Sequence, residues 1–220
     1  MKDKQVDLKQ AMAKLKDNST IMIGGFLGCG CPNVLIEAVV ESGAQNLTVI
    51  SNDTTFEDVG VGKLIASGQV TKLIATHIGT NPQTGRKMNA QEIEVELVPQ
   101  GTLAERIRAA GAGLGGVLTP TGLGTIIEEG KEKITVDGKV FLLEKPVHAD
   151  IALIKANKGD TWGNLFLVGS TRNFNLAMAT AADYVIAEVD ACVPLGEIEP
   201  AAVTIPGLFV DAVVSATNQA

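Results

Sequence analysis

The residues best suited to chemistry lie where predicted strands end. An apolar run over residues 21–23 breaks into a turn of small or apolar residues, namely Gly24, Gly25, Phe26, Leu27, Gly28, Cys29 and Gly30. Pro32 then opens a helical pattern. A turn so poor in side chains, followed by a helix N-terminus, favours close approach of an anion or a reacting oxyanion to backbone N–H groups. We therefore expect a ligand to contact these seven residues.

Two amide side chains follow other predicted strands. Gln100 comes after the strand predicted at 92–98, and Asn52 comes after the strand predicted at 47–50. An amide at a strand end donates well to a developing oxyanion, an interaction that changes a barrier by a few kcal/mol. His77 also follows a strand, although a lone histidine is more often structural. None of these strand ends carries an obvious charged nucleophile, so the pattern predicts a wall that orients a substrate and not a complete acid–base site.

The order of predicted elements indicates an α/β fold. Apolar, β-branched strands alternate with helical patterns, which predicts an open, mostly parallel sheet with helices on both faces, in a single domain over residues 1–220. Such sheets bind ligands beyond the carboxyl ends of their strands. The predicted helices are 3–16, 32–41, 61–66, 103–110 and 175–182; the further strands are 71–76, 149–154, 184–189 and 209–214. We also predict a loop over 111–124 and a hairpin over 134–143 around Asp137-Gly138.

Composition excludes several classes of function. The net charge is −7 and aromatic residues make up 4% of the chain, which argues against nucleic-acid binding and against binding to anionic membranes. The most apolar stretch is interrupted by polar residues and glycines, so no membrane span is expected. Three cysteines and no secretory signal predict reduced thiols and a cytoplasmic location. Cys29 and Cys31 lack a second ligand pair, so no metal site is expected.

A longer pattern surrounds the glycine turn. It reads Asp17-Asn18, then Gly24-Gly25-Phe26 after three apolar residues, then Gly30 and Pro32. This pattern resembles the first signature of the family I (3-oxoacid) coenzyme A transferases, in their A (alpha) subunit. Further blocks agree with the resemblance: residues 51–53, 77–82, 99–108, 119–125 and 172–175. The wording of residues 51–54, 77–82 and 113–116 is most similar to that of bacterial acetate/butyrate–acetoacetate members. The resemblance extends from about residue 17 to about residue 214.

The resemblance implies an enzyme that moves CoA between a short-chain acyl-CoA and a carboxylate such as acetoacetate, acetate or butyrate. It implies that the glycine turn contacts the CoA thioester, which is a substrate and not a resident cofactor, and that Gln100 and Asn52 position the substrate. In this family the nucleophile is a glutamate in a Ser-Glu-Asn-Gly block of the B subunit, and this chain has no Glu-Asn dipeptide. We therefore expect a beta-subunit partner in an A2B2 heterotetramer, with activity only in that complex.

An alternative of another class is a nucleotide- or sugar-phosphate-binding module of the NAD type without transferase activity. Gly28 and Gly30 begin a dinucleotide pattern, and Asp53 follows the second strand, where it suits a ribose. However, Asn33 stands where the third glycine belongs. A second glycine pattern over 111–116 has the correct spacing but follows a helix, which is the wrong context.

Overall fold

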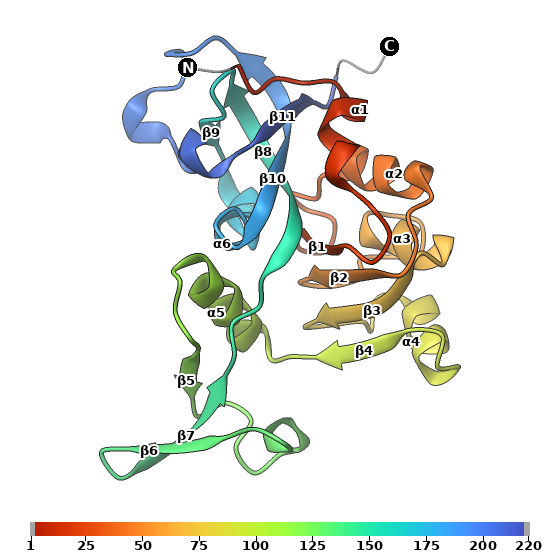
Figure 1. The fold of residues 1–220 in the computed structure, drawn as a ribbon, viewed down its shortest axis with the longest axis vertical. Coiled ribbons are helices and arrows are strands. Elements are labelled where there is room, and N and C mark those ends of the chain that lie inside the picture. Colours follow the sequence, from red (N-terminus) through yellow and green to blue (C-terminus); the bar gives the residue numbers. More distant parts are fainter. Residues whose placement is uncertain (1–2, 218–220) are drawn as a thin grey trace.

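A computed structural model describes residues 3–217 of the 220-residue chain. Its main element is an eight-stranded sheet in the order β11-β10-β8-β1-β2-β3-β4, in which β9 pairs with β8 (Figure 1). All pairings are parallel except that of β9. The strands are β1 (Thr20–Ile23), β2 (Leu47–Ser51), β3 (Val70–Ala75), β4 (Glu94–Leu97), β8 (Ala149–Asp160), β9 (Leu165–Phe166), β10 (Ala182–Val193) and β11 (Ala212–Ser215). The predicted α/β class is confirmed.

Helices cover both faces of this sheet and create two apolar cores. Successive side chains of a strand point to opposite faces, so Ile21 and Ile23 join one core while Met22 joins the other. The first core receives α1 (Leu8–Ala11), α2 (Asn33–Ser42) and α3 (Val61–Ser67); the second receives α5 (Gln100–Gly111) and α6 (Asn175–Met178). Because both faces are buried, the central strand β1 is apolar from Ile21 to Ile23 and does not alternate with polar residues.

A second, antiparallel sheet lies away from the main sheet, at the end of the molecule opposite the chain termini (Figure 1). It contains β5 (Val117–Thr119), β6 (Lys133–Val136) and β7 (Lys139–Glu144), in the order β5-β7-β6. The predicted hairpin is confirmed: Asp137 and Gly138 have φ of 50° and 74°, as a type I′ turn requires. The prediction of an uninterrupted loop over 111–124 is wrong, because β5 forms there by pairing with the distant β7.

Other boundaries differ from the sequence prediction for identifiable reasons. The predicted helix at 3–16 is reduced to α1 and a 3-10 turn at Met12–Lys14, because Gln5 pairs with Val213 at the sheet edge. The prediction overlooked α4 (Pro82–Asn89), whose N-cap Asn81 accepts hydrogen bonds from the N–H groups of Gln83 and Thr84. β8 and β10 are twelve residues each because they pair with one another along their whole length.

Three further ends also moved. α5 begins at Gln100 and not at Leu103, and α6 ends at Met178. The predicted last strand at 209–214 starts later, at Ala212, after a 3-10 turn at Gly207–Phe209.

Among the described residues, no helix combines the length and the apolar character needed to cross a bilayer.

Candidate functional site

The carboxyl ends of four neighbouring strands enclose a cavity. β1 leads into the glycine turn, and β2, β3 and β4 lead to Asn52, Thr76 and Gln100, respectively. The cavity has a volume of about 300 Å³ and is lined by Phe26, Leu27, Asn52, Asp53, Thr76, His77, Thr80 and Gln100. Larger hollows exist elsewhere in the described part of the chain, for example one between α5 and β5. The structure thus brings together, around one space, residues that are up to 74 positions apart (26 to 100) in the sequence.

The two predicted amides are in direct contact. Gln100 Nε2 donates to Asn52 Oδ1 at 2.8 Å, and the Thr76 hydroxyl donates to the Asn52 carbonyl oxygen at 2.8 Å. Asn52 is buried, whereas Gln100 is exposed at the first residue of α5. Asn52 therefore supports Gln100 from behind, and Gln100 is the amide that a ligand in the cavity can reach.

The glycine turn is packed against protein side chains. A Cβ atom on Gly24 would lie 1.7 Å from Asn175 Oδ1, and one on Gly25 would lie 2.2 Å from Cys31 Sγ. Gly25 also has φ of 127°, which residues with side chains rarely adopt. These two glycines are required by their neighbours in the fold. Phe26 and Leu27, by contrast, are 42% and 41% exposed and form the part of the turn that lines the cavity.

Most N–H groups of the turn already have acceptors within the protein. The N–H of Gly25 donates to Asn173 Oδ1 at 3.1 Å, and that of Leu27 donates to Asp53 Oδ2 at 2.9 Å. Phe26 and Cys29 bond to each other's carbonyl groups. Among the described residues, only the N–H groups of Gly28 and Gly30 in the turn 24–31 lack a protein acceptor. The sequence leads us to expect that the N–H groups along this turn are free to bind a ligand. Within the described residues 3–217 two of them remain free, those of Gly28 and Gly30.

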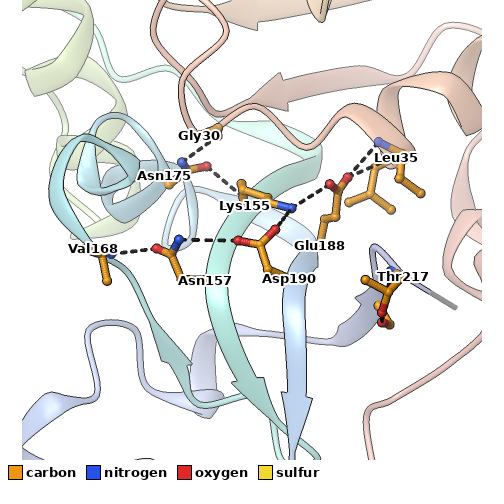
Figure 2. A network of polar contacts seen from close by, with 11 residues as sticks. Gly30, Leu35, Lys155, Asn157, Val168, Asn175, Glu188, Asp190 and Thr217 are labelled. Carbon is orange, nitrogen blue, oxygen red and sulfur yellow. Dashed lines mark hydrogen bonds and ion pairs between the residues drawn. The ribbon is translucent and has the colours of Figure 1, made fainter.

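The start of α2 is occupied by an internal carboxylate. Glu188 on β10 is buried, and its Oε2 accepts from the N–H groups of Val34 at 2.9 Å and Leu35 at 3.2 Å (Figure 2). Pro32 at the N-cap has no side chain that could do this. The positive end of the helix dipole, which the sequence suggested for an anionic ligand, therefore stabilises a carboxylate of the same chain.

A lysine balances that buried charge. Lys155 Nζ on β8 lies 2.9 Å from Glu188 Oε1 and 2.6 Å from Asp190 Oδ1 (Figure 2). Burial alone would lower the pKa of Lys155, but the hydrogen bond to Asp190 and the charge of Glu188 outweigh it and raise the pKa. The backbone N–H of Lys155 donates to Asn175 Oδ1, and Asn175 Nδ2 donates to the Gly30 carbonyl group. These contacts hold the turn and the start of α2 against β8 and β10.

One carboxylate borders the cavity, and it is not available for attack. Asp53 is 3% exposed, and both of its oxygens accept N–H groups, from Thr55 at Oδ1 and from Leu27 and Asn52 at Oδ2. No glutamate lines the cavity in the described part of the chain. The site can bind and orient a substrate oxygen, but among the described residues that line it there is no exposed carboxylate to act as a nucleophile.

Comparison with known proteins decides the family. The sequence profile of the family described as Coenzyme A transferase matches residues 6–216. The chain belongs to the coenzyme A transferase family. It is 53% identical to the acetate CoA-transferase subunit alpha of Escherichia coli (strain K12) over 214 residues, which are 97% of each chain. It is 51% identical to the acetoacetyl-CoA:acetate/butyrate CoA transferase alpha subunit of Clostridium acetobutylicum, covering 97% of this chain and 98% of the relative.

A solved structure agrees on the fold of this coenzyme A transferase chain. Glutaconate coenzyme A-transferase from Acidaminococcus fermentans superposes with a TM-score of 0.85 at 22% identity, over 97% of this chain and 75% of the other. The resemblance to this family, inferred from the signature around the glycine turn, is confirmed. These findings favour the transferase, and none of them supports the nucleotide- or sugar-phosphate-binding module.

Sequence reasoning found part of this candidate site and overlooked the rest. It singled out Gln100 and Asn52, which the structure places in contact, and the seven turn residues, of which Phe26 and Leu27 line the cavity. Cys29 is exposed, and its Sγ lies 3.0 Å from Ser170 Oγ. Thr76 and Glu188 were overlooked. Asp53 was singled out only for the dinucleotide alternative, and three further residues were named only within the family blocks, namely Thr80, Asn173 and Asn175. Asp53 had a signal, because it adjoins Asn52 in the block 51–53; Glu188 had none.

Proposed function

We propose that this chain is the alpha subunit of a heteromeric CoA transferase that moves CoA between a short-chain acyl-CoA and a carboxylate such as acetate, butyrate or acetoacetate. The substrate class is supported by the names of two relatives that are 53% and 51% identical along nearly the whole chain. The observation that carries the proposal is the cavity itself, which has an exposed amide donor and no exposed carboxylate.

The missing nucleophile comes, in this proposal, from a glutamate of a beta subunit that closes the cavity. Its carboxylate attacks the thioester carbonyl carbon, the C–S bond breaks, and CoA leaves as a thiolate, which yields an acyl–glutamyl anhydride. The thiolate then attacks the glutamyl carbonyl carbon and releases the first carboxylate, which leaves a glutamyl-CoA thioester. The second carboxylate runs the same steps in reverse, so the kinetics are ping-pong.

This chain contributes orientation and polar recognition to these steps. Gln100 donates an N–H to the carbonyl oxygen as negative charge develops on it, and Asn52 fixes the position of Gln100. The turn at 24–30 lies along the CoA thioester, where the N–H groups of Gly28 and Gly30 are the remaining donors. The CoA thioester is a substrate, no resident cofactor takes part, and the complex is an A2B2 heterotetramer in the cytoplasm.

The test is reconstitution with a partner chain that carries Ser-Glu-Asn-Gly. The two chains are co-purified and assayed for acetoacetyl-CoA formation from acetyl-CoA and acetoacetate, with each chain alone as a control. Only the complex is expected to turn over. Activity of this chain by itself would contradict the proposal that the nucleophile comes from the beta subunit. Gln100→Ala is expected to lower kcat by about 10²-fold or more without preventing assembly, and an unchanged kcat would remove Gln100 from the mechanism.

A further inference from the structure

Asp53 lines the cavity and contacts both the amide Asn52 and the glycine turn at Leu27. Its Oδ2 accepts from Asn52 Nδ2 at 2.7 Å and from the N–H of Leu27 at 2.9 Å, while Oδ1 accepts from the N–H of Thr55 at 2.8 Å. The residue is 3% exposed. The carboxylate therefore acts as the acceptor in all three of these contacts.

That single fact orients the neighbouring amides. Asn52 has to turn its NH₂ group toward Asp53, so its Oδ1 points the other way. On that side Oδ1 accepts from Gln100 Nε2 at 2.8 Å and from the Thr76 hydroxyl at 3.2 Å. Gln100 in turn has to present its NH₂ group to Asn52. The direction of each hydrogen bond therefore follows from the carboxylate, because an amide oxygen cannot donate.

We propose that Asp53 is a positioning residue that sets the hydrogen-bond polarity of Asn52 and Gln100, so that the second N–H of Gln100 is presented to a substrate oxygen in the cavity. This inference rests on the proposed function, since it requires Gln100 to act on substrate. The oxygen that orients Asn52 also holds the N–H of Leu27. The carboxylate thus fixes the positions of Asn52 and Gln100 relative to Leu27 in the glycine turn.

An exchange of the two side chains tests polarity separately from packing. Asn52→Asp alone places a second carboxylate against Asp53, at a contact that is 2.7 Å in the present structure. Asp53→Asn alone removes the acceptor-only group. The double variant N52D/D53N restores one donor and one acceptor between the two positions, and the carboxylate at position 52 still accepts from Gln100. The amide at position 53 then turns its NH₂ group toward the N–H of Leu27, so the recovery is expected to be partial.

The variants are compared in the complex with the partner subunit, as kcat per titrated active site and KM for acyl-CoA. We expect kcat to fall on the order of 100-fold in D53N, with KM changed by less than about threefold, because Asn52 can then turn over and Gln100 no longer presents an oriented donor in the transition state. The double variant is expected to be at least about tenfold faster than both single variants. Asp58→Asn is the matched control, because Asp58 lies in the same loop but is exposed; its kcat is expected to equal that of the unmodified chain.

A double variant no faster than the single variants would overturn this inference, because it would show that restoring the donor–acceptor pair at positions 52 and 53 does not restore turnover. If N52D does not assemble, the comparison with D53N decides in the same way. Gln100→Ala separates the two proposals: if it leaves kcat unchanged, the proposed role of Gln100 fails. If Gln100→Ala lowers kcat but the exchange does not restore turnover, only the polarity inference fails.

Discussion

Replacement of Glu188 by alanine is expected to destabilise the chain strongly. Glu188 lies on β10 with 3% of its side chain exposed, and it supplies the only side-chain acceptor found for the first turn of α2 among the described residues. Removing it leaves the N–H groups of Val34 and Leu35 without their partner. It also leaves Lys155, whose side chain is 14% exposed, with Asp190 as its one remaining partner.

The magnitude follows from these contacts. Breaking a buried ion pair by removing one partner costs about 3–5 kcal/mol, and loss of a helix cap costs about 1 kcal/mol. Because Asp190 still lies 2.6 Å from Lys155, the lower end of the first range applies. We expect the free energy of unfolding to fall by about 3–4 kcal/mol, which lowers Tm by roughly 10 °C for a chain of this size.

Thermal and urea unfolding of the purified chain measure this effect. Glu37→Ala is the matched control, because Glu37 is a glutamate of α2 itself and pairs with Lys63, but these two side chains are 49% and 41% exposed. An exposed pair contributes about 1 kcal/mol or less. Equal losses of stability in Glu188→Ala and Glu37→Ala would refute the reasoning that burial makes this carboxylate important.

The same network predicts how stability changes at alkaline pH. The pKa of Lys155 is raised above its ordinary 10.5, so the folded state holds this proton more tightly than the unfolded state. The resulting stabilisation is fully present below pH 10.5 and is lost as the pH rises through the higher folded value. Lys155→Met is expected to flatten this alkaline part of the unfolding profile, and a profile of unchanged slope would contradict the pairing.

Two further predictions concern the glycine turn and its surroundings. Gly24→Ala is expected to lower both stability and turnover, because its Cβ would lie 1.7 Å from Asn175 Oδ1; Gly85→Ala, in α4 with nothing within 4 Å, is expected to raise the free energy of unfolding by up to about 1 kcal/mol. If the two variants unfold alike, the described packing is wrong. Burial raises the pKa of Cys31 to about 12, so iodoacetamide at neutral pH is expected to modify the exposed Cys29 and spare Cys31 in the folded chain. Equal labelling of Cys29 and Cys31, measured by mass spectrometry, would contradict the burial of Cys31.

Local sequence was enough to predict the elements that carry their own signals. α2 begins after Pro32 and ends before Gly43, which has φ of 69°, and the β6–β7 hairpin forms at Asp137-Gly138. Each of these signals acts on backbone angles within a few residues, so it needs no partner elsewhere in the chain. Weaker signals were missed, as in α4, whose Asn81 cap precedes a polar helix.

The sequence by itself also determined that amides and a glycine turn would share one edge, because the carboxyl ends of parallel strands meet there. Only the tertiary structure decided which atoms meet: Asp53 with Leu27, and Glu188 with the start of α2, across 154 positions. Such contacts depend on the order and register of the strands in the sheet, which the separation of two residues in the sequence does not show. The sequence shows which residue types are present and in what order. A hydrogen bond requires two atoms to be about 3 Å apart, and the packed fold alone sets that distance.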